Sequence, residues 1–339
     1  MAERPDGSIY VLDGAEGTIT LYGPDGRFKA RFAGRGGGPG EFSRPGPMDL
    51  LGDTIRVLDT GANRVTLFDL SGAVIGTIPL RLGFDERGFR LMPAFLFLDG
   101  TVVASSLVPS DVVADGLVQA VPMIRARSTG EVLDTIAHIP LANRTLAIRS
   151  PDETRPGGMF TQQPLADFPL FGLSLYDSTV VIVDRRATNV DHFGVVKLTP
   201  RGDTLYASRI PYAPSPITEE FEADIVSRWT ESAASSPALS HLAPGALRRI
   251  VREALYLPPV QPPVSAFLVA RDAGVWLRRE ARGRDTVEWL ILDPALEPIG
   301  RTRLPARITI REATTRHVWA VDRDSNDVQS LIRLRIVRD

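Results

Sequence analysis

Apolar and polar residues alternate along much of the chain, and this two-residue period is typical of β-strands that bury one face. Ile9 and Val11 occupy alternate positions in one run, and Ile19 and Leu21 do so in the next. Short sequences that favour turns, such as GPDG at 23–26, separate the runs. We therefore expect short, half-buried strands joined by hairpin turns over most of the chain.

The strand pattern repeats along the chain. Residues 7–32 align without a gap with residues 53–78, and the identical positions include Asp13 and Asp59 at the end of the second strand of each unit. A repeat of about 40–50 residues is typical of propeller blades. Looser copies follow, so we expect an all-β, six-bladed β-propeller that forms one domain over 1–339. The expected blades cover 5–33, 46–80, 91–140, 168–211, 264–305 and 306–337.

Residues 213–262 interrupt the strand pattern with two helical stripes, which predict a two-helix insertion between blades four and five. Phe221, Ile225 and Trp229 recur every four residues, and Leu247 and Val251 do so in the second segment. Two interpretations stay open: the helices pack on the propeller and cover one of its mouths, or they form a hairpin that binds a partner. The candidate residues for partner binding are Phe221, Arg228, Trp229, Arg248, Arg249 and Arg252.

A glycine-rich stretch, GRGGGPGEFSRPGP at 34–47, invites comparison with a phosphate-binding loop. Such a loop needs a helix directly after it, because the N-terminus of that helix holds the phosphate. Here several prolines and then a predicted strand take the place of the helix. We therefore interpret the stretch as the connection from the outer strand of one blade to the inner strand of the next.

The stretch 34–78 resembles the NHL-type repeat: GPGEF and a proline precede the inner strand, and IRVLD and NRVTLFD mark the next two strands. The whole chain resembles the secreted six-bladed propellers of Gemmatimonas-like bacteria. The resemblance implies a propeller without a common active site. Members of this group usually have further strands upstream, so we expect both blades at the seam of the ring to be one strand short. An open seam exposes an unpaired strand edge.

The composition limits the kinds of partner that the protein is expected to bind and the cellular compartment in which it is expected to reside. The formal net charge is −2, which gives no basic surface of the kind that binds nucleic acid. There is no cysteine, and no apolar run approaches the roughly 20 residues that span a bilayer. The first residues, MAERPDGSIYVLD, do not read as a signal peptide, although the resemblance implies export; an upstream start would reconcile the two. We expect a periplasmic location or one on the extracytoplasmic membrane surface.

Acidic residues are the main candidates for chemistry in the chain. Asp13 and Asp59, with their counterparts in later blades, end the second strand, where an aspartate accepts hydrogen bonds from the following turn. We therefore interpret them as structural residues. A calcium site in the central channel, as in six-bladed lactonases, would need six to eight converging oxygens. The nearby candidates for such a site are Asp49, Asp167 and Glu312.

These observations favour a non-enzymatic protein-binding or scaffold propeller that carries no cofactor. The possible open seam extends this hypothesis to an extrinsic subunit of a bacterial membrane complex, for example a photosynthetic reaction centre with its light-harvesting ring. The alternative is a calcium-dependent lactonase or hydrolase with its site in the central channel. A third hypothesis is a sensor of small molecules or glycans at the channel mouth.

Overall fold

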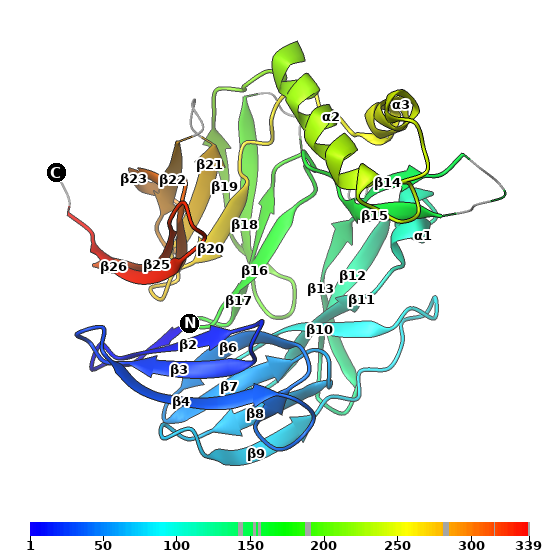
Figure 1. The fold of residues 1–339 in the computed structure, drawn as a ribbon. Coiled ribbons are helices and arrows are strands. Elements are labelled where there is room, and N and C mark those ends of the chain that lie inside the picture. The colour runs from blue at the N-terminus through cyan, green and yellow to red at the C-terminus, as the bar shows by residue number, and fades with distance from the viewer. Residues whose placement is uncertain are drawn as a thin grey trace.

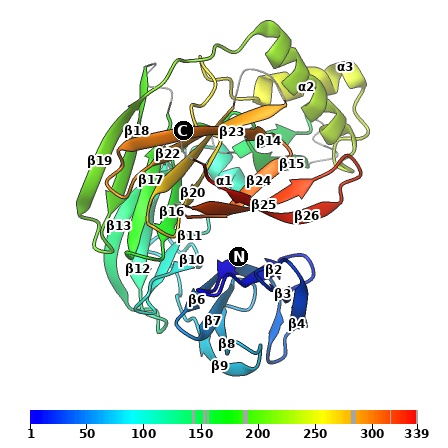
Figure 2. The same cartoon turned by 90° about the vertical axis from the view of Figure 1, so that its left-hand side faces the viewer.

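A computed structural model of the chain describes residues 1–141, 145–151, 154, 157–186, 191–280, 285–314 and 316–337. Six antiparallel sheets are arranged around a common centre and form the six-bladed β-propeller that the sequence predicts. Figure 1 shows blades one and two at the bottom, in blue, and blades five and six at the left, in orange and red. In Figure 2 the N-terminus lies between these two groups of blades.

The first three blades are built from consecutive strands, each hydrogen-bonded to the next. Blade one consists of β1 (Ala2–Glu3), β2 (Ile9–Asp13), β3 (Thr18–Tyr22) and β4 (Phe28–Arg35), to which β5 (Glu41–Phe42) adds in parallel. Blade two consists of β6 (Pro45–Leu51), β7 (Thr54–Asp59), β8 (Arg64–Phe68) and β9 (Val74–Pro79). Blade three consists of β10 (Leu91–Leu96), β11 (Val102–Ser106), β12 (Ala120–Ala126) and β13 (Val132–Pro140).

The last three blades follow the same order of strands from the centre outward. Blade four consists of β16 (Leu170–Ser174), β17 (Thr179–Asp184), β18 (His192–Leu198) and β19 (Thr204–Pro211). Blade five consists of β20 (Ala266–Val269), β21 (Val275–Glu280), β22 (Thr286–Leu292) and β23 (Pro298–Pro305). Blade six consists of β24 (Ile308–Ala313), β25 (His317–Arg323) and β26 (Gln329–Arg335).

The second strand of blade two is buried on both faces, whereas the sequence pattern indicates one buried face. All residues of β7 except the first are buried, but no residue of the outer strand β9 is. The difference arises because each blade is packed between two neighbours, so both faces of an inner strand contact protein. A polar residue on such a strand needs a buried partner, and Arg56 of β7 accordingly pairs with Asp49.

Clusters of buried apolar side chains lie between successive blades. One cluster each joins blades one and two, two and three, three and four, four and five, and five and six. The last of these contains Trp276 and Trp289, whose ring centroids are 6.4 Å apart. No such cluster of described residues joins blade six to blade one. This interface, the seam, is therefore held by other interactions.

The strands at the seam differ from the prediction that both seam blades are one strand short. Residues Ala2–Glu3 form β1 and pair with β2, so blade one, expected over 5–33, begins at Ala2 and has its inner strand. A strand of two residues is too short to produce an alternating pattern, which is why the sequence does not predict it. Blade six has three strands in the described part of the chain, and β26 is the outermost. Among the described residues, therefore, blade six alone has fewer than four strands.

The glycine-rich stretch joins blade one to blade two, and the strand β6 follows it, which confirms that it is a linker. Phe42 is fully buried and anchors the linker in the apolar cluster between the two blades. Arg64 of β8 donates hydrogen bonds to the carbonyl oxygens of Gly38 and Glu41. Gly36 has a φ of 152°, and a Cβ atom there would overlap the carboxylate of Glu41. The glycines therefore serve the close packing of this loop.

Two insertions stand outside the blades, although the sequence predicts only one. The hairpin of β14 (Thr145–Arg149) and β15 (Gly158–Gln162) lies between blades three and four, and α2 (Glu219–Ala234) and α3 (Pro244–Ala254) lie between blades four and five. The helices pack over the hairpin, and we call these four elements the helical module (Figure 1). The helices thus contact the hairpin insertion, which the sequence does not predict. A short helix, α1 (Ser110–Ala114), also contacts β14.

No helix in the described ranges is both long enough and apolar enough to cross a membrane.

Candidate functional site

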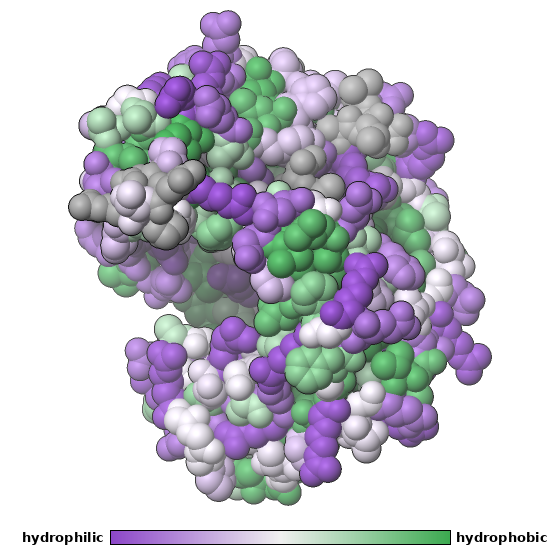
Figure 3. Space-filling model, turned by 90° about the vertical axis from the view of Figure 1, so that its right-hand side faces the viewer, coloured by the Kyte–Doolittle hydropathy of each residue, from purple (hydrophilic) through white to green (hydrophobic). Residues whose placement is uncertain are grey.

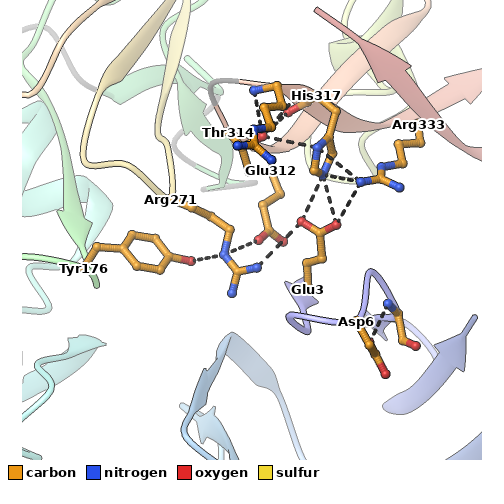
Figure 4. A network of polar contacts seen from close by, with 10 residues as sticks. Glu3, Asp6, Tyr176, Arg271, Glu312, Thr314, His317 and Arg333 are labelled. Carbon is orange, nitrogen blue, oxygen red and sulfur yellow. Dashed lines mark hydrogen bonds and ion pairs between the residues drawn. The ribbon is translucent and has the colours of Figure 1, made fainter. Parts of the chain in front are cut away.

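Charged and polar side chains from four blades meet at the centre of the ring, next to the seam (Figure 4). Glu3 of β1 is buried, and both of its carboxylate oxygens lie 3.0 Å from Nε2 of His317. Arg271 lies just after β20. One of its terminal guanidinium nitrogens is 3.7 Å from a carboxylate oxygen of Glu3, and its Nε is 3.2 Å from a carboxylate oxygen of Glu312. Its Nε also donates a hydrogen bond of 2.8 Å to the hydroxyl of Tyr176. The channel network, as we call it, comprises Glu3, Tyr176, Arg271, Glu312, His317 and Arg333.

The channel network joins blade one to blade six across the seam. Arg333 of β26 lies 3.5 Å from Glu3, and its guanidinium is 5.5 Å from the centre of the Trp319 ring. Thr314 accepts a hydrogen bond from the backbone N–H of His317 and so fixes the turn before β25. Buried ion pairs fix geometry but contribute little net stability compared with apolar packing. We therefore expect the seam to be weaker than the five interfaces that apolar clusters hold.

Burial alters the acidity of two residues in the network. It raises the pKa of Glu312 above the usual value of a glutamate, although Arg271 opposes the change. Burial likewise raises the pKa of Tyr176. Neither carboxylate oxygen of Glu312 has a hydrogen-bond donor among the described residues, but Arg271 lies at ion-pair distance. The charges of the network are thus paired mainly with one another, an arrangement suited to holding blades together.

Two cavities border the channel network. One has a volume of 710 Å³ and extends from Glu312 to Val11 and Val321, which lie on the two sides of the seam. The other has a volume of 180 Å³ and is lined by Tyr176 and Asp49. Figure 3 shows a hollow in the surface between the upper part of the molecule and the lower part, which contains blades one and two in Figure 1. The centre of the ring therefore has room for solvent or a small polar molecule.

The three calcium candidates do not form a common site. Arg56 holds Asp49 through two hydrogen bonds, of 2.7 and 2.9 Å. Asp167 accepts a hydrogen bond of 3.1 Å from the hydroxyl of Tyr256, which follows α3. Glu312 is paired within the channel network. Among the residues that the structure describes, no group of three His, Asp or Glu side chains could hold a metal ion.

Sequence reasoning identified only Glu312 of the channel network. No sequence pattern points to Glu3, Arg271 or His317 as members of a site. Glu3 and His317 are 314 residues apart in the sequence, so no local pattern could place them together. One weak signal was present: Arg271 almost directly follows the apolar inner strand AFLV, where a charged side chain needs a buried partner.

Phe221 and Trp229 of α2 belong to the core of the helical module. Both are half-buried and pack against the apolar cluster of the module, which includes Ile225 and Leu247. Thr218 caps the helix, because its hydroxyl accepts a hydrogen bond from the backbone N–H of Phe221. The stripe of residues four apart is thus the buried face of α2. These two side chains thus contribute to the packing of the module, and their part in partner binding stays a prediction.

The four arginines that were candidates for partner binding fall into two pairs. Arg228 and Arg252 form ion pairs with acidic residues of α2, at 3.0 and 2.8 Å. Arg248 and Arg249 of α3 are exposed, and no described residue forms a hydrogen bond or an ion pair with either side chain. The module therefore presents two free positive charges on one helix.

Replacing Glu3 with glutamine is expected to lower the free energy of unfolding by about 2 kcal/mol. The reason is that Arg271, His317 and Arg333 lose the carboxylate that they contact. The measurement is urea unfolding followed by tryptophan fluorescence, since the ring of Trp319 lies 6.4 Å from that of His317 at the seam. Glu16→Gln, an exposed change in the turn after β2, is the control and should leave the midpoint unchanged. Equal midpoints for both variants would contradict a stabilising role of the channel network.

Comparison with known families agrees with the fold. A family model described as a 6-bladed beta-propeller matches residues 3–86, which contain blades one and two. Comparison with curated proteins finds no match. The resemblance to NHL-type repeats and to propellers of Gemmatimonas-like bacteria stays a prediction.

Several solved structures are similar to this chain at low identity. A protein from Bacteroides fragilis described as exported is 10% identical, with a TM-score of 0.48, over 99% of this chain and 89% of that chain. A member of the DUF4221 family from Bacteroides vulgatus is 8% identical, with a TM-score of 0.48, over 97% and 88% of the two chains. The virginiamycin B lyase from Staphylococcus aureus is 11% identical, with a TM-score of 0.41, over 94% and 89%. Likeness at this level assigns no activity to the chain.

Proposed function

We propose that the protein is a non-enzymatic, protein-binding propeller and that its helical module docks an acidic surface of a partner. The observation that carries the proposal is the pair Arg248 and Arg249, which are exposed on α3 and have no acidic partner among the described residues. The neighbouring arginines of the same module are neutralised by ion pairs. A guanidinium binds a carboxylate through two parallel hydrogen bonds, so a partner rich in Asp and Glu fits this helix face.

The construction of the module supports a docking role. Its buried cluster is separate from the five clusters between the blades, and it combines residues of β14, α2 and α3. The module therefore adds a folded surface without supplying the apolar packing between blades. Functional surfaces are often built in this way, on insertions that a rigid scaffold positions. Charged groups on such a surface raise the rate of encounter with a partner of opposite charge.

The alternative function, a calcium-dependent lactonase or hydrolase, has weaker support. Calcium is bound by six to eight oxygens that converge on one point. Asp49 already forms two hydrogen bonds with Arg56, and Glu312 is paired with Arg271. A metal ion at either carboxylate would have to displace these guanidinium groups. The periplasmic location and a membrane-bound host, including a photosynthetic one, stay predictions of the sequence resemblance.

The proposal is tested with the double variant Arg248→Glu/Arg249→Glu, purified from the native source through an affinity tag. We expect the wild-type protein to bring down one partner at a fixed stoichiometry and the variant to retain less than about a tenth of it, as a loss of about 1.4 kcal/mol or more requires. The matched control is Arg35→Glu/Arg201→Glu, which makes the same change of charge at two exposed arginines on other parts of the ring. Recovery of the wild-type chain alone, or equal retention by both variants, would refute the proposal.

A further inference from the structure

The hairpin of the helical module has one strand edge that lies in a groove. β14 pairs only with β15 in its sheet, and no other described strand adds to this pair. A cavity of 350 Å³ borders β14, and Thr145, Ala147 and Arg149 are among the residues that line it. An unpaired strand edge presents free backbone N–H and C=O groups, which readily pair with another chain. The groove is therefore an open position beside the hairpin sheet.

The register of the hairpin shows which backbone groups face this groove. At the turn end of the hairpin, the backbone N–H of Ser150 donates to the carbonyl oxygen of Gly157. In an antiparallel pair, residues that bond to the neighbouring strand alternate with residues that point away from it. Because the register continues unbroken along β14, Ala147 and Arg149 direct their N–H and C=O groups away from β15. No described residue forms a hydrogen bond with these backbone groups.

The helices α1 and α3 lie on opposite faces of the hairpin, as Figure 1 shows. Leu146 and Ile148 point from one face into the apolar cluster that includes α3. Arg149 points from the other face and forms an ion pair of 2.7 Å with Asp115, the residue after α1. Side chains of a strand alternate between its two faces. A strand added beside β14 would therefore direct its side chains alternately toward α3 and toward α1.

The lining of the groove favours small apolar side chains on such a strand. The groove is apolar at the ends of both helices, where its lining includes Val113, Ala114, Ala254 and Leu255. The charged residue of the lining, Arg149, is already paired with Asp115. A charged side chain that entered the groove would lose its water without gaining a partner of opposite charge.

A buried amide closes the groove at the first residue of β14. The side chain of Gln163 is buried, and its amide nitrogen donates hydrogen bonds of 3.3 and 2.8 Å to the carbonyl oxygens of Thr145 and Ala254. This amide ties β14 to the end of α3 and satisfies the outward carbonyl group of Thr145. The backbone groups of Ala147 and Arg149 remain for pairing, so the groove admits only a short segment.

We propose that the edge of β14 binds a short extended segment of the partner protein, which becomes the third strand of the hairpin sheet. Its backbone bonds to Ala147 and Arg149, and its small apolar side chains lie between the ends of α1 and α3. Main-chain hydrogen bonds provide the affinity, and the alternate side chains provide the specificity. Arg248 and Arg249 belong to the same helix, α3, so one partner can contact both places. The inference rests on the proposed docking role of the module and names the segment that the partner supplies.

The test uses the whole chain and the blocked peptide Ser-Val-Ala-Val-Ser. Amide hydrogen exchange should be fast at Ala147 and Arg149 in the free protein, and the bound peptide should slow it at both residues. The matched control is the same peptide with N-methyl groups on its central residues, which removes the N–H groups that would bond to β14. It should bind at least about tenfold more weakly than the unmodified peptide.

Two variants test the groove from different sides. Ala147→Pro removes an N–H that faces the groove and none that bonds to β15. Ala114→Phe fills the groove from α1 and leaves β14 unchanged. Each variant should weaken peptide binding at least about tenfold. Ala207→Pro, the same change on the outward-facing edge of β19, is the control and should bind as the wild type does.

Three results would overturn the inference. Slow exchange at Ala147 and Arg149 in the free protein would mean that the edge is already covered. Failure of the peptide to bind at millimolar concentration, or equal binding of its N-methylated form, would exclude recognition through the main chain. Equal affinity of the wild type and both groove variants would place the peptide elsewhere. The variant Arg248→Glu/Arg249→Glu should bind the peptide normally, so a failure of the proposed charge contact is distinguishable from a failure of the groove.

Discussion

Replacing Asp59 with alanine is expected to lower the free energy of unfolding by about 4 kcal/mol. Asp59 is fully buried, and its carboxylate accepts hydrogen bonds from four backbone N–H groups, those of Ser43, Arg44, Gly61 and Ala62. Alanine would leave these donors without an acceptor inside the protein, and unsatisfied buried donors are costly. The measurement is the midpoint and slope of urea unfolding.

Asp13 provides a matched control, because it occupies the same position of the repeat in blade one. It is exposed and accepts hydrogen bonds from only two backbone groups, those of Ala15 and Glu16. Asp13→Ala is therefore expected to reduce stability by about 1 kcal/mol. Similar losses for the two variants would contradict the assignment of the large effect to the buried hydrogen bonds of Asp59.

The effect of Asp59 should also depend on pH. Burial by itself would raise the pKa of this carboxyl group, but the backbone hydrogen bonds outweigh burial and lower the pKa below its usual value. Its stabilising contribution is then present above the pKa of an unfolded aspartate, about 3.9. The contribution is lost as the pH falls through the lower pKa of the folded state. The stability of the wild type should therefore fall more steeply with acid than that of Asp59→Ala.

Replacing Lys197 with methionine is expected to lower the free energy of unfolding by about 3 kcal/mol. Nζ of Lys197 is buried, lies 2.6 Å from a carboxylate oxygen of Asp177, and donates to the carbonyl oxygens of Ala273 and Pro294, each at 3.2 Å. These contacts link blade four to two turns of blade five. Methionine preserves most of the volume but leaves Asp177 and both carbonyl groups without the ammonium group. Chemical unfolding measures the loss.

The chain contains one further lysine, Lys29 of β4, which is exposed and makes no comparable contact. Lys29→Met is therefore the control and should change the stability by less than about 0.5 kcal/mol. Equal unfolding midpoints for Lys197→Met and the wild type would show that the link between blades four and five is dispensable.

The six interfaces between neighbouring blades differ in the interactions that hold them together. Five interfaces have apolar clusters, and some also have a buried cation such as Lys197 or Arg56. The seam instead has ion pairs centred on Glu3. Local opening takes place where buried apolar contacts are few. We therefore expect any opening of the ring to begin between blades six and one.

The sequence alone determined the number of blades and most of their strands. Alternating patterns and turns act between residues close in the chain, so each hairpin can be recognised from its own segment. The same holds for the stripes that predict α2 and α3. β14 and β15 escaped recognition because their short sequences match no copy of the repeat. The helices pack on this hairpin through contacts that no local pattern encodes.

Only the tertiary structure decided which residues meet and what each one does. Asp13 and Asp59 have the same place in the repeat. The linker between blades one and two, however, donates the backbone N–H groups of Ser43 and Arg44 to Asp59 and not to Asp13. Phe221 and Trp229 pack in the core of the module because the hairpin lies beneath them. The channel network joins Glu3 to His317 because closing the ring brings the first and last blades together. Such long-range contacts depend on the closure of the whole ring, which no single segment of the sequence determines.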